Sequence, residues 1–415
     1  MSTSRFRKID RCRICGNSEL TSVLSLGNQA LTGVFPKTRE TPITIGPLTL
    51  VKCSGGADVC GLLQLAHSYD SNEMYGENYG YRSGLNPSMV RHLQRKVERI
   101  LGMAELRQGD LVVDIGSNDG TTLNSFPKGK GTLVGFDPTG LKFREYYDRD
   151  VLLVPDFFSK DALKAQLGSK RAKIVTSFAM FYDLENPLAF VQGIHDVLAD
   201  DGIWVFEQSY MPAMLETNSF DTVCHEHLEY YGLKQIAWMA DRAGLVIKDV
   251  EFNNVNGGSF SVTVGKRRRD DNHSDQLPEL LRREAQYDDL APFREFAART
   301  ERARTELRDF VAKAWKGGKA VRGLGASTKG NVLLQYCEFT SDDIECIGEV
   351  NPQKFGRFTP GTHIPIVPED TLFGPESSCV VVLPWHFREF FLASPRFAPL
   401  NLVFPLPRLE SVAAR

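Results

Sequence analysis

The segment 111–123 reads LVVDIGSNDGTTL, a short apolar run followed by a glycine-rich loop. The run is typical of a buried strand, and glycines after a strand let the backbone approach a ligand closely. Open α/β sheets bind ligands at the carboxyl ends of their strands, where this loop would lie. The loop matches neither GxGxxG nor GxxxxGK(S/T). The segment therefore predicts a parallel sheet with a ligand other than a dinucleotide at this loop.

Short apolar runs recur along the rest of the chain, with helical stretches between them. One unit contains GTLVGFD, AKIVTSFAM and GIWVFEQ, and a second contains AVRGLGAS, IECIGEV, IPIVP and CVVVLPW. This alternation predicts an α/β protein with two Rossmann-like units. The charged, aperiodic stretch 266–275 is interpreted as a linker, and a long charged helix is expected at about 290–315.

Four of the eight cysteines fall in the first 60 residues: Cys12, Cys15, Cys53 and Cys60. The first two form a CxxC knuckle, and the other two are separated by six residues, SGGADV, which is longer than usual. Two such pairs predict a closed, structural zinc site with four cysteine ligands, and two unrelated surface pairs are the alternative. A region this short has too small a hydrophobic core to be stable without a metal site or another cross-link. The chain is expected to divide into three domains: a zinc-binding domain at 1–67, and two domains at 68–268 and 269–415 that each contain one Rossmann-like unit.

The overall composition excludes several protein classes. The 49 Lys and Arg nearly balance the 52 Asp and Glu, which gives a formal net charge of −3. A dedicated nucleic-acid binder is therefore disfavoured. No apolar run approaches about 18–20 residues, so no membrane span is expected. The first residues lack an apolar signal region, so a cytoplasmic protein is expected.

Candidate ligand-binding residues end the second and third strands of the first unit. Asp137 ends the second strand, where a carboxylate can accept both ribose hydroxyls, and Phe178 ends the third, where adenine would lie. The arrangement resembles the S-adenosylmethionine (SAM) site of class I methyltransferases, and a Gly-rich turn of another Rossmann-type protein is the alternative. The candidate cofactor residues are Asp114, Gly116, Ser117, Asn118, Asp119, Gly120, Asp137, Pro138, Phe178 and Ala179.

A dense polar block, His225-Glu226-His227, follows Cys224 beyond the strand GIWVFEQ. The spacing is not that of HExxH, and an H-x-H metal site would lack an evident third ligand. A general base with a neighbouring carboxylate to orient it or tune its pKa is the favoured interpretation. Three adjacent polar groups are costly to bury unpaired, which disfavours a purely structural role.

Taken together, the motifs resemble those of the nucleotide-sugar C-methyltransferase family. The shared features are the zinc cysteines, DIGSNDGTTL, the HEH block, NGGSF at 256–260, GASTKGN at 325–331, NPQK at 351–354, PGTHIP at 360–365 and LPW at 383–385. The resemblance implies a small zinc-binding domain, a class I SAM methyltransferase domain and a C-terminal Rossmann-like domain. It also implies that a nucleotide-diphosphate sugar binds between the last two domains.

The resemblance further implies carbon methylation beside a 4-keto group in branched-chain sugar biosynthesis. His227 would be the base that forms the enolate, and Glu226 and His225 would shape its surroundings and bind sugar hydroxyls. Tyr79 or Tyr81 resembles the family's sugar-site tyrosine. Lys329 follows a Gly-rich turn at a helix start, which suits a diphosphate, although it could also be an ordinary surface lysine. The candidate substrate residues are Lys329, Asn331, Asn351, Lys354 and Arg357.

The chain departs from well-studied members in two places. Cys224 replaces a tyrosine, so a weak thiol donor stands where a phenol could donate to an enolate; a small buried spacer is the alternative. Phe181-Tyr182-Asp183 stands where such members carry a histidine, and Tyr182 could supply the lost hydroxyl. An O- or N-methyltransferase and a non-catalytic sugar-nucleotide binder remain alternatives. A monomer or weak oligomer is expected.

Overall fold

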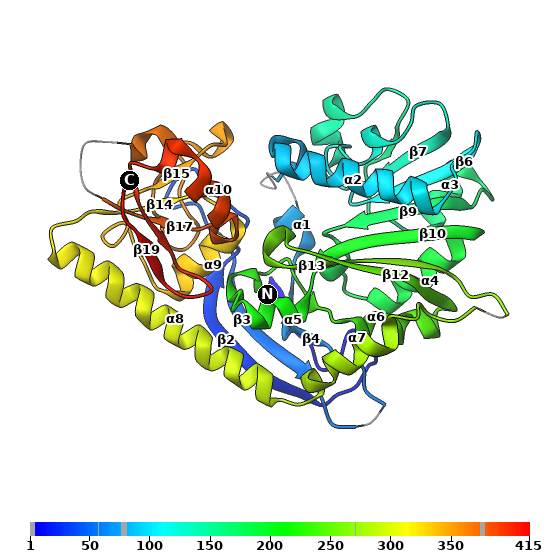
Figure 1. The fold of residues 1–415 in the computed structure, drawn as a ribbon, viewed down its shortest axis with the longest axis horizontal. Helices are drawn as coiled ribbons and strands as arrows, with labels where there is room; N and C mark the ends of the chain where they lie inside the picture. The colour runs from blue at the N-terminus through cyan, green and yellow to red at the C-terminus, as the bar shows by residue number, and fades with distance from the viewer. Residues whose placement is uncertain (1–4, 57, 76–80, 270, 374–377) are drawn as a thin grey trace.

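The computed structural model describes residues 5–56, 58–75, 81–269, 271–373 and 378–415. Two α/β lobes lie side by side, and long N-terminal strands pass beneath and between them (Figure 1). The lobe built on the seven-stranded sheet is here termed the central lobe, and the lobe built on the six-stranded sheet the C-terminal lobe. The two Rossmann-like units expected from the alternation of strands and helices are therefore present.

The central sheet has the strand order β12-β13-β10-β9-β6-β7-β8. β13 is antiparallel to both of its neighbours, whereas the pairs from β10 to β8 are parallel. The four apolar runs predicted from the sequence form β6, β7, β9 and β10, which are largely buried. The strands are β6 (Asp110–Ile115), β7 (Gly131–Phe136), β8 (Leu152–Val154), β9 (Ala172–Phe178), β10 (Leu198–Ser209), β12 (Leu245–Asn253) and β13 (Ser259–Lys266).

Helices cover both faces of the central sheet. Helix α2 begins at Pro87 because Asn86 accepts a hydrogen bond from the Ser88 amide, and proline is favoured in a first helical turn. The helices of this lobe are α2 (Pro87–Met103), α3 (Lys160–Leu167), α4 (Pro187–Val197), α5 (Met211–Glu216), α6 (Leu233–Arg242) and α7 (Leu277–Glu284).

The C-terminal sheet has the order β16-β15-β14-β17-β18-β19, with all pairs parallel except β18 and β19. The long charged helix is confirmed as α8 (Ala291–Lys316), which runs along the outside of this lobe (Figure 1). The remaining elements are β14 (Val321–Leu324), β15 (Ile347–Glu349), β16 (Ile366–Pro368), β17 (Cys379–Val382), β18 (Asn401–Phe404), β19 (Glu410–Val412), α9 (Thr328–Tyr336) and α10 (Arg388–Ala393).

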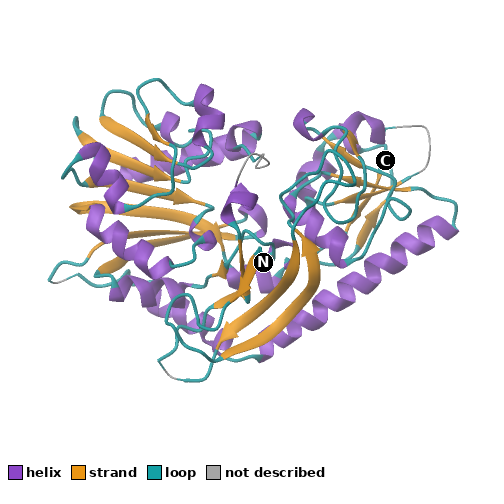
Figure 2. Cartoon of the chain, turned by 180° about the vertical axis from the view of Figure 1, so that it is seen from behind, coloured by secondary structure: helices purple, strands orange, loops and turns teal. Residues whose placement is uncertain are grey.

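The N-terminal region forms an antiparallel sheet with the order β11-β4-β3-β2. Its edge strand β11 follows the HEH block and pairs with β4, so a segment of the central lobe completes this sheet. Figure 2 shows its long strands curving beside α8. The strands are β2 (Leu20–Ala30), β3 (Ile45–Cys53), β4 (Leu63–Leu65) and β11 (Glu229–Tyr230), and a separate pair joins β1 (Phe6–Lys8) to β5 (His67–Tyr69), ahead of α1 (Ser71–Tyr75).

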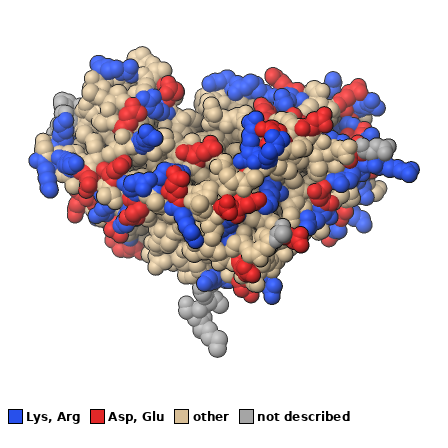
Figure 3. Space-filling model, turned by 60° about the horizontal axis from the view of Figure 1, so that its bottom comes forward, with Lys and Arg blue, Asp and Glu red and all other residues tan. Residues whose placement is uncertain are grey.

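The molecular surface agrees with the near-zero net charge. On the face in Figure 3, lysines and arginines are interspersed with aspartates and glutamates. Within the part of the chain that the structure describes, we find no helix that combines the length and apolar character needed to cross a membrane.

Candidate active site

The four N-terminal cysteines converge on one point. Their sulfur atoms all lie within 4.8 Å of one another. The Sγ atoms of Cys12 and Cys60 are 3.4 Å apart, and those of Cys15 and Cys53 are 3.5 Å apart. A tetrahedral zinc centre with four thiolate ligands requires sulfur separations of about 3.8 Å, so the set fits a zinc ion. All four positions would be protein ligands, which makes the centre structural.

A cavity of about 210 Å³ opens at the carboxyl ends of β6, β7, β9 and β10. It contains an acid at the end of β7, aromatic walls and several further carboxyl groups, which suits a ribose, an adenine and a sulfonium. The predicted cofactor residues that line it are Asp114, Gly116, Ser117, Asn118, Asp137, Pro138, Phe178 and Ala179.

Asp137 is held rigidly at the cavity wall. Its Oδ1 accepts from the amide and hydroxyl of Thr139 at 2.7 and 2.6 Å, and its Oδ2 accepts from the Asn118 amide at 2.8 Å. Oδ2 therefore keeps a lone pair for a ribose hydroxyl. Burial raises the pKa of Asp114 to about 7, although the Thr176 hydroxyl donates to it at 2.6 Å.

Asp119 and Gly120 differ from the prediction, since neither lines the cavity. The Asp119 carboxylate instead accepts from the Gly84 amide at 2.9 Å, and Asn118 donates to the Tyr81 carbonyl at 3.0 Å. These bonds fix the segment that carries Tyr81 over the cavity, which Tyr81 lines. Tyr79 lies outside the described residues.

Among the cavity residues that sequence reasoning missed, two groups carry titratable side chains. Asp156, Phe157 and Phe158 follow β8 and form part of the lining. Their signal was present in LLVPDFF, where an apolar run ends in an acid. His92 and Glu207 also line the cavity, but they meet only in the folded chain, 115 residues apart in sequence.

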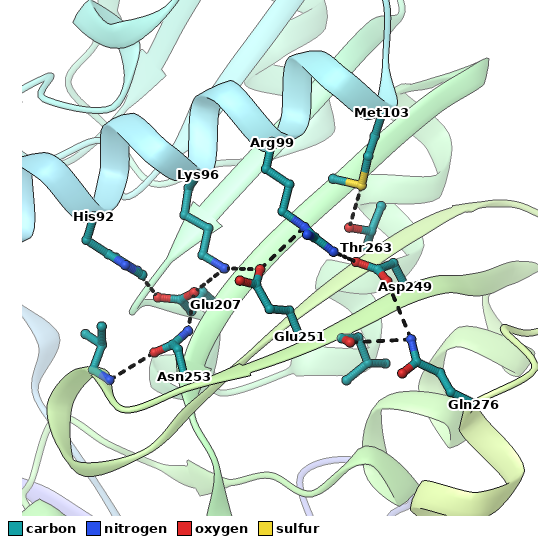
Figure 4. Close-up of polar contacts among 12 residues, drawn as sticks. His92, Lys96, Arg99, Met103, Glu207, Asp249, Glu251, Asn253, Thr263 and Gln276 are labelled. Atoms are coloured by element: carbon teal, nitrogen blue, oxygen red, sulfur yellow. Dashed lines mark hydrogen bonds and ion pairs between the residues drawn. The ribbon is translucent and has the colours of Figure 1, made fainter.

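Glu207 is the centre of a buried charge cluster between α2 and β10 (Figure 4). Its carboxylate lies 2.5 Å from His92 Nε2 and 2.7 Å from Lys96 Nζ, and it accepts from the Asn253 amide at 2.9 Å. Despite burial, these partners lower the pKa of Glu207. The cavity wall therefore carries an ionised carboxylate that Lys96 compensates in part.

His227 is the partly accessible histidine of the HEH block. Its Nδ1 donates to the Thr222 carbonyl at 3.0 Å, so Nε2 carries no proton and can accept one. Its ring packs on that of Tyr182 with a centroid separation of 4.3 Å, and Tyr182 also lines the cavity. Burial, together with the positive charge of Lys329, lowers the pKa of His227 to about 4.

The neighbours of His227 are less accessible than the sequence suggested. His225 is fully buried, with its ring edge-on to Tyr69 at 4.6 Å, so it cannot bind sugar hydroxyls as predicted. Cys224 is also fully buried, and burial raises the pKa of its thiol well above the usual range. Its side chain hydrogen-bonds to Glu226, and its burial agrees with the alternative of a small buried spacer. Glu226 is partly accessible and accepts from the Thr32 hydroxyl at 3.4 Å.

The predicted substrate residues lie where the C-terminal lobe meets the rest of the chain. Lys329, in the first turn of α9 as expected, donates to the carbonyl of the cavity residue Asn256 at 3.0 Å. Lys354 donates to the Ala326 carbonyl at 2.6 Å, and Arg357 donates to the Phe35 carbonyl at 3.1 Å.

Two of these residues have internal structural roles. Asn331 is fully buried and donates to the Thr32 carbonyl at 2.7 Å, so its prediction as a substrate ligand is corrected: its amide joins two domains. Asn351 accepts from the Gln353 amide at 3.0 Å and so caps a short turn.

Fold, cavity and cysteine cluster together define a SAM-dependent methyltransferase with a structural zinc site. Three family models match successive parts of the chain: "Putative zinc binding domain" at 12–75, "Methyltransferase domain" at 86–250 and "C-methyltransferase C-terminal domain" at 254–407. Along its length, the chain is thus similar to C-methyltransferases that combine these three domains.

Known proteins are similar to the whole chain or to a part of it. The C-methyltransferase NovU of Streptomyces niveus is 29% identical over 422 residues, and the alignment covers 98% of each chain. Among solved structures, the CcbJ methyltransferase from Streptomyces caelestis is 13% identical, with a TM-score of 0.34 over 42% of this chain and 90% of that chain. YcgJ from Bacillus subtilis is 15% identical, with a TM-score of 0.33, and the match covers 43% of this chain and 99% of that chain.

Proposed function

We propose that this enzyme transfers a methyl group to a carbon beside the ketone of a nucleotide-linked 4-keto-deoxysugar. The observation that carries the proposal is the hydrogen bond from His227 Nδ1 to the Thr222 carbonyl, which in the neutral ring leaves Nε2 free of a proton beside the cofactor cavity. Carbon methylation needs a carbanion-like nucleophile, and a ketone acidifies the hydrogens on the neighbouring carbons. A neutral imidazole can remove one of them.

The chain supplies the base and its environment, and SAM, when bound, supplies an electrophilic methyl group. The low pKa of His227 keeps the imidazole neutral at neutral pH. An enolate forming beside the ring would stabilise the imidazolium, because an opposite charge nearby favours the protonated form. Thr222 holds the ring in the required tautomer throughout.

We further propose that the sugar diphosphate binds between the central and C-terminal lobes. Lys329 is the principal candidate, because its ammonium already reaches the cavity wall at Asn256 and retains donors for a phosphate oxygen. Lys354 and Arg357 would add positive charge further along the same lobe, with Asn351 beside them. Because the net charge is only −3, local groups must attract the anionic substrate.

Deuterium exchange tests the proposal. The enzyme is incubated in D₂O with 4-keto sugar nucleotides and no methyl donor, and label at the carbon beside the ketone is followed by mass spectrometry. We expect exchange in the wild type and its loss in His227→Asn, with little change in SAM affinity by calorimetry. Methylation without exchange would instead indicate transfer to an oxygen or nitrogen.

A further inference from the structure

Asp183 is a cavity residue whose carboxyl group has no role so far. It ends the 3-10 turn Phe181–Asp183 after β9 and lines the cofactor cavity beside Tyr182. Tyr182, the residue before Asp183, packs on the ring of His227 and lines the same cavity as Asp183. Its Oδ1 is shielded from solvent and has no hydrogen-bond partner among the described residues. The Tyr75 side chain hydrogen-bonds to the carboxyl group.

The surroundings of Asp183 oppose a negative charge. Burial, and then the nearby Glu226 carboxyl, hold the pKa of Asp183 well above its usual range. Glu229 is a second buried carboxyl group nearby, and Arg13, the cation that faces it at 3.8 Å, lies equally far from Glu185. The titratable groups around Asp183 are Tyr75 from α1, Cys224 and Glu226 from the HEH block, and Glu229 and Tyr230 from β11.

We propose that Asp183, as a neutral carboxylic acid, donates a hydrogen bond to the ketone oxygen and stabilises the enolate. This inference rests on the proposed function. A carboxylic acid that its site keeps neutral at pH 7 can stabilise an oxyanion in this way. The need for a donor is clear, because Cys224 is a weak donor and is fully buried.

The proposed reaction uses only the groups named above for its proton and electron transfers. His227 Nε2 removes a proton from the carbon beside the ketone, and the C–H electron pair becomes the enolate, with charge on the oxygen. Asp183 hydrogen-bonds to that oxygen and keeps its own proton. The carbon then forms a bond to the methyl group, the C–S pair stays on sulfur, and the oxygen becomes a ketone again. The imidazolium releases its proton to water.

Two substitutions test whether the Asp183 side chain must donate a hydrogen bond or need only be polar. Asp183→Leu removes the donor, and we expect deuterium exchange to slow by about 100-fold, the cost of losing one oxyanion donor. Asp183→Asn retains an N–H donor and should keep most of the rate. Since Asp183 acts in its protonated form, wild-type exchange should fall as pH rises through the raised pKa of this carboxyl group. Asp183→Asn should lack this alkaline decline.

The control is Glu105→Gln, an exposed carboxylate paired with the exposed Arg107, which should exchange like the wild type. Thermal melting and zinc content verify that each variant folds. If Asp183→Leu exchanges at the wild-type rate, or if Asp183→Asn still shows the alkaline decline, the role of Asp183 is overturned. The proposed function would still stand in either case. No exchange by the wild type with any keto sugar would overturn the proposed function itself, and the Asp183 assignment with it.

Discussion

His225 shows how a residue inside a catalytic-looking motif can serve the core. Its side chain is fully buried against Tyr69, and the backbone groups of Gly46 and Gln29 lie beside the ring. Burial lowers the pKa of His225 from 6.5 to about 3. The folded protein therefore keeps this ring neutral over a pH range in which the unfolded chain takes up a proton.

The stability of the protein should depend on pH through this residue. The contribution is complete above pH 6.5 and is lost as pH falls from 6.5 towards 3. Each pH unit in that range costs about 1.4 kcal/mol of unfolding free energy. His225→Phe should remove this share of the slope. Urea unfolding of both proteins at neutral pH and near pH 5 measures the difference, and parallel slopes would contradict it.

At the scale of elements, α2 docks on the central sheet through a row of polar contacts. His92, Lys96 and Arg99 project from one face of the helix towards Glu207, Glu251 and Asp249 (Figure 4). Spacings of four and three residues place all three on the same side. The helix and the strands β10 and β12 are thereby joined by ion pairs that become more exposed along the helix.

Substitution along this face should have graded effects. Lys96 is buried and pairs with Glu207 at 2.7 Å, so Lys96→Met leaves a buried carboxylate under-compensated. We expect a loss of about 3 kcal/mol of unfolding free energy. Arg99→Met removes an exposed pair and should cost less than about 1 kcal/mol. Denaturant unfolding measures both, and equal losses would argue against the burial explanation.

Local patterns account for what the sequence predicted. The strands β6, β7 and β9 and the cofactor loop are contiguous segments, so their apolar runs and glycines could be recognised directly. The pairing of β11 with β4 and the contact of His92 with Glu207 join distant segments, and no local period encodes them. His225 and Asn331 were predicted to bind the substrate because their side chains are polar. Burial decides whether such a group faces a ligand or the core, and the sequence pattern does not show it.

At the scale of the whole molecule, the zinc knuckle connects to the catalytic segment. Arg13 lies between two zinc cysteines and donates to the Leu65 carbonyl at 2.6 Å and the Ser68 hydroxyl at 2.9 Å. Its Nε lies 3.8 Å from Glu229, which comes two residues after His227. The knuckle therefore helps to fix the strand that follows the base, whereas the cofactor cavity is built on the central sheet.

Removal of zinc should impair the positioning of the base but leave the binding of SAM intact. Chelation would release the CxxC turn and Arg13, so β11 and the HEH block would lose their anchor. We expect deuterium exchange to fall by about 10-fold or more, as when a supporting group around a metal site is lost. Calorimetric SAM binding should persist, and added zinc should restore exchange. Arg13→Met, with zinc content verified as complete, is the matched variant and should show the same pattern. Full exchange activity in zinc-free protein would mean that the base is positioned without the N-terminal domain.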